Sequence, residues 1–338
     1  PIEGVAGNGE HTHLGAAIKL KNGKRVNLFA PRDARDDYLS EIGYGALMGI
    51  LKNYEVINPI VTATNDAFNR LKPGFEAPVC IVTSLGGTKE QPSRNRSVLV
   101  GVIRDINNPG VVRFELRAPN PYSNTYLVLA SCYQAMLDGI KNVTDAGLSC
   151  GDLEKEISKK YGDDAVYLEK YREYRSEEDV FEKYSSEERS RLYGTAPATV
   201  WENLRGFTDN RLKQQVLKSG DVFTDGLINS FKESTLEKWK NELKGRIIHD
   251  NIMLLKTFIK LHNEQDHATD LDVVNWEKIV YLKTKLMKDS MTKKSIFTKI
   301  TTALDEDDYN AASDLQKQMN QLMTEIRKLY IEYKNNIF

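Results

Sequence analysis

The sequence lacks several features that would quickly place a protein in a functional class. Its 338 residues include only three cysteines, Cys80, Cys132 and Cys150, and their spacing matches no metal-binding pattern. We therefore expect buried thiols in a reducing compartment. No apolar run approaches the roughly 18 residues that a membrane-spanning helix needs, and we find no secretory signal. These absences predict a cytoplasmic protein without a membrane partner.

An excess of positive charge is also missing. Lysine and arginine number 47 against 48 aspartate and glutamate, which gives a net charge of −1. Because nucleic-acid binders generally carry a basic excess or a basic stripe, we expect no nucleic-acid partner. The chain begins Pro-Ile-Glu-Gly without a methionine, and we expect it to be a fragment of a longer protein.

The pattern along the chain predicts an α+β fold, with an antiparallel sheet and packed helices, followed by an all-helical C-terminal part. Asn22 and Gly23 form a hairpin signal between two strand-like segments. Residues 36–54 read as a helix that Asp36 can cap, and a second helix should run from after Pro121 to near Gly139. Buried strands are expected within 77–85, 97–105 and 110–119.

The second half of the chain has a different character. Residues 151–194 are rich in charged residues and tyrosine, which predicts exposed helix and loop, and residues 200–245 read as amphipathic helix. The last part has a coiled-coil-like seam, Leu315, Met319, Leu322, Ile326, Leu329 and Tyr333. We therefore divide the chain into 1–150, 151–250 and 251–338, the last being a helical hairpin or coiled-coil extension.

Polar residues alternate with apolar ones along the third expected strand. Arg113, Glu115 and Arg117 share one face because a strand has a period of two. They form either an exposed salt-bridge ladder of little energetic value or part of an anion site, since arginine forks match phosphate and carboxylate. Arg70, Arg94 and Arg96 could contribute to the same site.

Two further features carry possible chemistry. His11 and His13 would share one face of a strand; they are either structural or ligands of Mg²⁺ or Mn²⁺ together with a distant glutamate. In NRLKPGFEAPV, residues 69–79, a Pro-Gly turn and a second proline present Glu76 on a stiff loop. A metal, an arginine clamp and an acidic loop are parts suited to phosphoryl transfer.

Five motifs in order over residues 8–140 resemble the C-terminal half of the glutamine synthetase catalytic domain. They are the asparagine-glycine and histidine motif near the start, RLKPGFEAP, RNRS, RFELRAPNP and NTYLVLASCYQAMLDGI. Residues 200–245 resemble the closing helices of the family more loosely. The resemblance implies a ligase that uses ATP to phosphorylate the side-chain carboxylate of glutamate, after which ammonia attacks the γ-glutamyl phosphate.

The resemblance also implies roles for particular residues. His13 and Glu115 would be metal ligands for Mg²⁺ or Mn²⁺, and Arg96 and Arg113 would bind the phosphates of ATP, with Arg96 also catalytic. Glu76 would be the catalytic glutamate on a loop that closes over the intermediate, excludes water and helps ammonium lose its proton. Glutamate would be bound by a set of four residues: Asn8, Gly9, Arg70 and Arg117.

Several positions depart from the family pattern. Aligning on the His-x-His sequence would make His11 the metal ligand, whereas the spacing to the Asn22 and Gly23 turn favours His13. Ala17 and Gly101 replace residues that bind nucleotide in many members. Tyr193 is, by position alone, comparable with the tyrosine that adenylylation modifies in some bacterial members, and a packing role is the alternative.

The resemblance covers only part of the family fold. The N-terminal domain and the strands with most metal-binding glutamates have no match here, so we expect this chain alone to be inactive and the full-length protein to be a homo-oligomer. Two alternatives stay open. The ligase could use another amine, or a non-catalytic relative could use its helical C-terminus to bind a partner or organise an oligomer.

Overall fold

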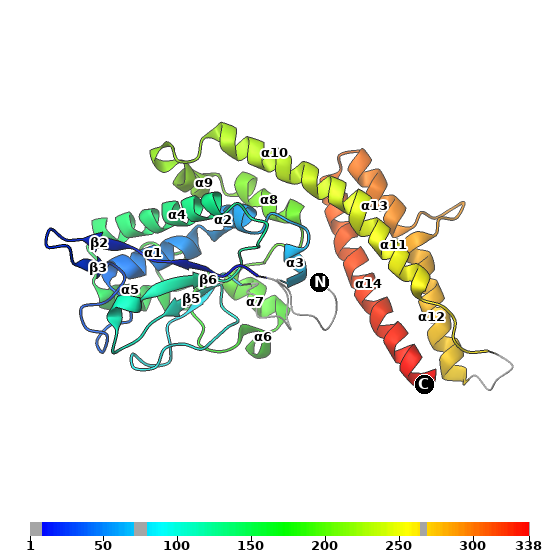
Figure 1. The fold of residues 1–338 in the computed structure, drawn as a ribbon, viewed down its shortest axis with the longest axis horizontal. Coiled ribbons are helices and arrows are strands. Elements are labelled where there is room, and N and C mark those ends of the chain that lie inside the picture. The colour runs from blue at the N-terminus through cyan, green and yellow to red at the C-terminus, as the bar shows by residue number, and fades with distance from the viewer. Residues whose placement is uncertain (1–8, 71–79, 264–268, 338) are drawn as a thin grey trace. The chain divides into compact units, whose positions relative to one another are not determined.

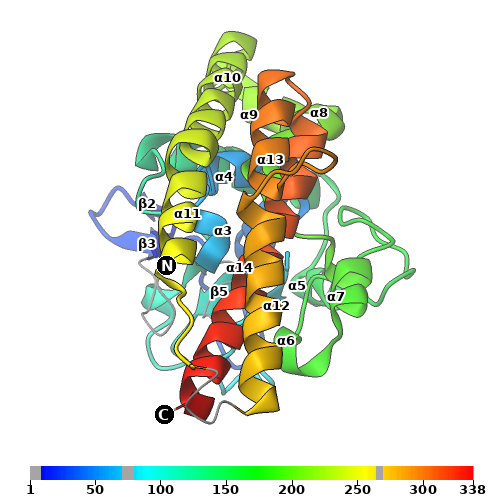
Figure 2. The same cartoon turned by 90° about the vertical axis from the view of Figure 1, so that its right-hand side faces the viewer.

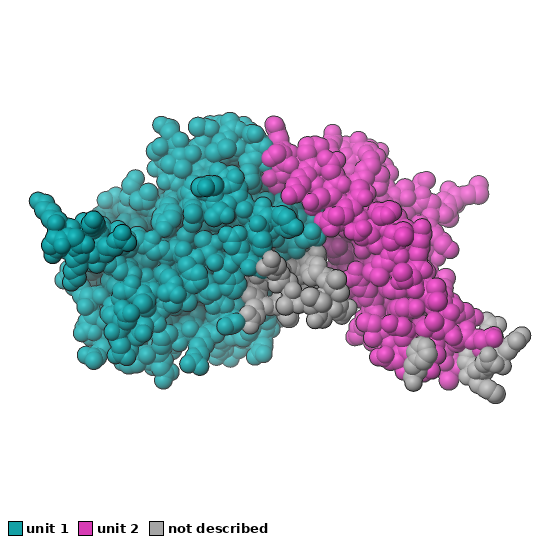
Figure 3. Space-filling model, in the orientation of Figure 1, with its two compact units in different colours: residues 1–232 teal, residues 233–338 magenta. Residues whose placement is uncertain are grey.

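The computed structural model describes residues 9–70, 80–263 and 269–337, without the side chains of residues 69 and 70. The chain divides into two compact units, residues 1–232 and 233–338 (Figure 3). The first unit contains all the strands that the structure describes and the second is helical, which confirms the α+β class followed by a helical part. The three-part division drawn from the sequence stays a prediction.

The main sheet of the first unit has the strand order β1-β6-β5-β4, and Figure 1 labels its strands β5 and β6. Its strands are β1 (Thr12–Leu14), β4 (Thr83–Ser84), β5 (Val100–Ile103) and β6 (Arg113–Leu116). β1 and β5 both pair antiparallel with β6, as predicted, whereas the short β4 runs parallel to β5. The predicted alternation in β6 is confirmed, because Phe114 and Leu116 are fully buried on one face.

A separate two-stranded hairpin joins β2 (Ala17–Lys19) to β3 (Arg25–Asn27). This hairpin confirms the prediction from Asn22 and Gly23. Gly23 has a φ of +84°, which glycine adopts without the clash that a Cβ would cause.

Two helices cover the apolar face of the sheet and pack closely on each other: α1 (Glu41–Lys52) and α4 (Thr125–Asp145). Glycines permit the close approach, since a Cβ on Gly49 would lie 2.1 Å from the carbonyl oxygen of Ala135. A Cβ on Gly139 would lie 2.0 Å from the carbonyl oxygen of Gly45. The sheet side of the core includes a stacked pair of rings, Phe29 and Phe114, with centroids 4.6 Å apart.

The predicted limits of both helices were wrong. Ser40, not Asp36, caps α1 by accepting a hydrogen bond from the Gly43 N–H. Asn124 caps α4 by accepting from Tyr126 and Leu127, and the helix continues through Gly139 because that glycine lies in the tight contact with α1 rather than at a C-cap.

Residues 151–194 are less exposed than the sequence predicted. Arg172, Tyr174 and Ser176 are buried, as are Glu156 and Lys159. Charged groups are tolerated there because they are hydrogen-bonded: Lys159 Nζ, for example, donates to the carbonyl oxygens of Lys170 and Arg172. The remaining elements of the first unit are α2 (Tyr54–Val61), α3 (Ala67–Arg70), η1 (Pro109–Val111), α5 (Cys150–Ile157), α6 (Val180–Lys183), α7 (Ser186–Tyr193), α8 (Val200–Asp209), α9 (Arg211–Lys218) and η2 (Ser219–Asp221).

The second unit is a helical assembly in which α12 and α13 pack along α14 (Figure 2). Its elements follow α10 (Asp225–Glu242), which begins in the first unit: the π-turn η3 (Leu243–Ile247), α11 (Ile248–Thr257), α12 (Asp270–Met287), α13 (Ile296–Asp305) and α14 (Tyr309–Ile337). In the predicted seam, Met319, Leu322, Ile326 and Tyr333 are buried, while Leu315 and Leu329 are half-buried. Among the described residues, no helix is long and apolar enough to span a membrane.

Candidate functional site

The polar face of the main sheet brings together side chains from β6 and from residues at the start of β1. The register places His13 opposite Glu115, and the side chains of His11, His13, Arg113 and Glu115 lie on the face away from the buried Leu14 and Phe114. The sequence predicted this shared face correctly, because the alternation of a strand decides which side each residue takes.

Glu115 lies at the centre of this face, with a partner on each carboxylate oxygen. His11 Nδ1 lies 2.8 Å from Oε1, and Arg117 Nη2 lies 2.8 Å from Oε2. His11 Nδ1 and Glu115 Oε1 therefore face each other directly, and the tautomer of His11 decides which of them donates. The arrangement fixes the direction of both the carboxylate and the imidazole.

Gly101 in β5 leaves the room that this arrangement needs. It pairs with Glu115 in the register of the two strands. A Cβ on Gly101 would lie 3.3 Å from both Glu115 Oε2 and Arg117 Nη2, which is tighter than ordinary van der Waals contact. The departure from the family pattern at Gly101 therefore has a structural consequence, since a larger side chain would displace the Glu115 and Arg117 pair.

His13 has a different environment from His11. Arg113 Nε donates to His13 Nδ1 at 3.0 Å, and Arg113 Nη1 donates to the Val111 carbonyl oxygen at 3.0 Å. His13 Nδ1 thus faces Arg113, whereas His11 Nδ1 faces Glu115. The geometry therefore favours His11 over His13 as the partner of Glu115, although the assignment of the metal ligand stays a prediction.

An imidazole nitrogen and a carboxylate oxygen form a donor set that suits Mn²⁺ or Mg²⁺. His11 and Glu115 thus fit such an ion as two of its ligands. Within the described ranges, no group of three or more histidine, cysteine, aspartate or glutamate side chains could hold a metal. A complete site needs more ligands than this pair supplies.

Two of the arginines predicted to bind anions, Arg96 and Arg117, belong to segments that lie beside Glu115, whereas Arg113 contacts His13. Arg117 is buried, and its Nη1 lies 3.5 Å from the carbonyl oxygen of Arg96, so the RNRS segment lies beside Glu115. Arg96 itself is exposed, as an anion-binding side chain needs to be. Arg113 lies two residues before Glu115 and contacts His13 instead.

Some predicted residues cannot be placed. Asn8 and Glu76 lie outside the described residues, as does the side chain of Arg70, whose backbone ends α3. Gly9 is described, and the next residue, Glu10, donates its N–H to the Pro119 carbonyl oxygen at 3.1 Å. The start of the described chain therefore lies beside the residues that follow Arg117.

Tyr193 is fully buried and packs with Cys80, Val82, Val98 and Val180. Its ring also contacts that of Tyr184 edge-on, with centroids 5.5 Å apart. A modifying enzyme could not reach this hydroxyl in the folded chain, so the packing role holds and the adenylylation alternative is wrong for this structure.

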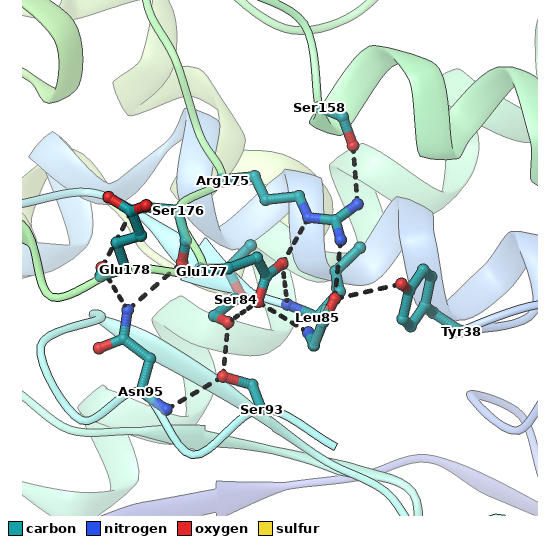
Figure 4. Close-up of polar contacts among 12 residues, drawn as sticks. Tyr38, Ser84, Leu85, Ser93, Asn95, Ser158, Arg175, Ser176, Glu177 and Glu178 are labelled. Carbon is teal, nitrogen blue, oxygen red and sulfur yellow. Dashed lines mark hydrogen bonds and ion pairs between the residues drawn. The ribbon is translucent and has the colours of Figure 1, made fainter. Parts of the chain in front are cut away.

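A polar network that the sequence did not reveal holds the loop before β5 (Figure 4). The Glu177 carboxylate accepts hydrogen bonds from the backbone N–H groups of Leu85 and Gly86 at 3.2 and 2.9 Å. It also accepts from Ser84 Oγ, and from Arg175 Nε at 2.6 Å. The only local sign of this network is the serine and glycine content of residues 84–97, because Glu177 is more than 80 residues away.

A cavity of about 410 Å³ lies elsewhere in the first unit, between α2, α8 and the loop at residues 194–197. Its wall includes Glu55, whose carboxylate contacts Arg172 and lies 2.9 Å from Lys213 Nζ. Burial raises the pKa of Glu55, but the charges of Arg172 and Lys213 outweigh it and lower the pKa overall. The lining also includes Leu99 and Ala118, which lie next to the site strands.

The chain is similar to known proteins over its N-terminal half. A family model described as the glutamine synthetase catalytic domain matches residues 1–161. The glutamine synthetase of Escherichia coli K12 is 38% identical over 149 residues, which cover 44% of this chain and 28% of that protein. The glutamine synthetase of Halobacterium salinarum is 38% identical over 149 residues, covering 44% of this chain and 29% of that protein.

Among solved structures, a Plasmodium falciparum glutamine synthetase aligns with a TM-score of 0.48 and 21% identity, covering 70% of this chain and 45% of that chain. The chain spans about 28% of the length of the curated relatives it matches. The range matched by the family model includes the segment that carries the polar face. Residues 1–161 are therefore similar to the glutamine synthetase catalytic domain.

Proposed function

We propose that this chain is the C-terminal portion of an ATP-dependent glutamate–ammonia ligase, which forms glutamine through γ-glutamyl phosphate. The observation that carries the proposal is the contact of His11, Glu115 and Arg117 on one sheet face, beside the exposed Arg96, within the family-matched segment. A carboxylate held between an imidazole and a guanidinium suits a site where metal, phosphate and carboxylate meet.

The residues take the following roles in this proposal. Glu115 and His11 hold a divalent ion, Mg²⁺ or Mn²⁺, which when bound offsets negative charge on the transferred phosphoryl group. Arg117 orients the glutamate carboxylate, while Arg96 and Arg113 bind the phosphates of ATP, where positive charge stabilises the transition state. Asn8, Gly9 and Arg70 complete the glutamate site and Glu76 is the acid that closes it.

The first experiment is an assay of the full-length protein that contains this chain. We expect phosphate release from ATP that requires glutamate, ammonium, and Mg²⁺ or Mn²⁺, and we expect Arg96→Ala to reduce kcat/KM at least about 100-fold. Arg205→Ala is the control, because Arg205 pairs only with the exposed Asp209 on α8. Release that requires a different amine would favour the alternative ligase, and no release with any amine would contradict both ligase proposals.

One observation favours an additional role for the helical C-terminal unit. The helix α12 buries Ile279, Leu282 and Leu286, yet Leu271, Val274 and Tyr281 are exposed. These exposed side chains are apolar surface that the unit itself does not cover. We propose that a second copy of the chain covers this surface in a homo-oligomer.

A further inference from the structure

The two arginines of the RNRS segment are separated by a residue that points the other way. Arg94 and Arg96 are exposed, whereas Asn95 is half-buried and Ser97 is buried. Asn95 Oδ1 accepts hydrogen bonds from the N–H and Oγ of Ser97 at 2.8 and 2.7 Å. The side chains of Asn95 and Ser97 thus fix the backbone from which Arg96 projects.

The partners of this segment lie more than 80 residues later, in a stretch that we name the strap, residues 174–180. Asn95 Nδ2 donates to the carbonyl oxygens of Glu178 at 2.7 Å and Ser176 at 3.4 Å (Figure 4). Ser97 Oγ accepts from the Val180 N–H at 3.0 Å. The strap therefore holds the residues on both sides of Arg96.

The strap is itself fixed to the sheet. The Thr83 N–H donates to the Tyr174 carbonyl oxygen, and the Ser176 N–H donates to the Thr83 carbonyl oxygen, both at 2.9 Å. These bonds form a parallel β-bridge between Thr83 and Arg175, so the strap extends the sheet beyond β4. The loop is consequently tied to a rigid element rather than to another loop.

Glu177 joins the strap to the start of the same loop. In addition to its bonds from Ser84, Leu85 and Gly86, it pairs with Arg175. Burial alone would raise the pKa of Glu177, but the hydrogen bonds from Ser84 and Arg175 outweigh it and lower the pKa. The carboxylate is therefore charged at neutral pH and accepts four hydrogen bonds.

Ser84 extends the network across the loop, since its Oγ also contacts Ser93 Oγ, and Ser93 Oγ accepts from the Asn95 N–H at 3.1 Å. A continuous series of hydrogen bonds thus leads from Glu177 to the residue beside Arg96. A 14-residue loop that is ordered in this way loses less conformational entropy when its arginine binds an anion.

We propose that Glu177 and Asn95 are positioning residues, through which the strap holds Arg96 in place for the phosphates of a nucleotide. This inference rests on the proposed function and adds to it a segment, residues 174–180, that lies outside the family-matched range. We expect the larger effect of the strap on the nucleotide, because Arg117 keeps its ion pair with Glu115 at 2.8 Å in addition to its longer contact with the Arg96 carbonyl oxygen at 3.5 Å.

The test compares Glu177→Gln with Glu178→Gln in the full-length protein. The two carboxylates are neighbours, but the side chain of Glu178 forms an exposed ion pair with Lys183 at 3.0 Å. ATP affinity is measured by calorimetry, and amide hydrogen exchange is measured over residues 93–97. We expect Glu177→Gln to weaken ATP binding on the order of tenfold and to speed the exchange, Glu178→Gln to change neither, and Glu177→Asp to restore part of the affinity.

A second variant separates positioning from folding. Asn95→Asp keeps the size of the side chain but removes the donor to the Glu178 and Ser176 carbonyl groups. We expect it to weaken ATP binding as Glu177→Gln does, while the KM for glutamate stays within about twofold and the melting temperature changes little.

The possible results separate the two proposals. ATP affinity that is unchanged in Glu177→Gln and Asn95→Asp but lost in Arg96→Ala would overturn the strap inference and leave the ligase proposal standing. Normal ATP binding without ammonium-dependent phosphate release would contradict the ligase proposal and leave the strap inference standing. A wild-type protein that does not bind ATP would overturn both.

Discussion

At the scale of single residues, Glu115 organises the polar face because each of its oxygens has one partner. The alternation of Arg113, Glu115 and Arg117 was readable from the sequence, since the period of a strand alone determines it. Which histidine meets Glu115 was not readable, because it depends on a diagonal contact between strands. The spacing favoured His13, whereas the structure brings His11 to the carboxylate.

This difference leads to a prediction about metal binding. We expect His11→Ala to weaken Mn²⁺ binding at least about tenfold in the full-length protein, because it removes a proposed ligand. His13→Ala is the matched control and should weaken binding less, since His13 contacts Arg113 instead of Glu115. Titration followed by electron paramagnetic resonance measures both, and a larger loss in His13→Ala would restore the original assignment.

At the scale of elements, the sequence indicated the hairpin, β5, β6 and α4, which are local patterns. It did not indicate that residues 174–176 join the sheet beside β4, because this pairing depends on Thr83, about ninety positions earlier. The same dependence on distant partners explains why the sequence predicted that residues 151–194 would be exposed. Its charged residues are buried only through partners such as Glu55, which come from distant elements.

The crossing of α1 and α4 gives a prediction about stability. We expect Gly49→Ala to lower the free energy of unfolding by about 3 kcal/mol or more, because the new Cβ would lie 2.1 Å from the Ala135 carbonyl oxygen and force the helices apart. Urea unfolding measures the change.

Gly151→Ala is the control for this crossing. Gly151 is exposed in the first turn of α5, and the nearest atom to its added Cβ, Ser149 Oγ, would be 3.9 Å away. Its effect should stay within about 1 kcal/mol. Equal losses of unfolding free energy in the two variants would show that alanine destabilises the chain through backbone conformation and not through the contact between α1 and α4.

At the scale of the whole molecule, the two units contribute differently. The first unit joins α2, α9 and residues 169–172 through the ion pairs of Glu55 with Arg172 and Lys213. Because these charges lower the pKa of Glu55 below its ordinary value of 4.5, the ionised form stabilises the fold. This contribution is complete above about pH 4.5 and is lost as the pH falls through the lowered pKa.

We therefore expect Glu55→Gln to lower the free energy of unfolding by about 2 kcal/mol at pH 7, since it leaves the buried Arg172 and the half-buried Lys213 with a weaker partner. The difference from the wild type should shrink below pH 4.5. Denaturant unfolding at several pH values measures it, with Asp164→Asn as the control because that carboxylate is almost fully exposed. If the difference in unfolding free energy between Glu55→Gln and the wild type grew as the pH fell, it would contradict a stabilising role for the ionised Glu55.

The second unit gives a prediction about assembly. We expect the combined variant Leu271→Ser, Val274→Ser and Tyr281→Ser to reduce the mass of the oligomer measured by light scattering, because it removes apolar surface that a second copy would cover. Met291→Ser is the control, since Met291 is exposed on the loop after α12. An unchanged mass in the triple variant would exclude this surface as the interface.

The distance along the chain between Asn95 and the strap also has a consequence for synthesis. The two partners are 83 positions apart, and a ribosome completes the arginine segment long before it completes the residues that hold it. A polypeptide that terminates between Leu116 and Tyr174 would contain the whole RNRS motif and all the strands that the structure describes in the main sheet. If the strap positions Arg96 as we propose, this product would bind nucleotide poorly, and premature termination would release a polypeptide that competes little for ATP.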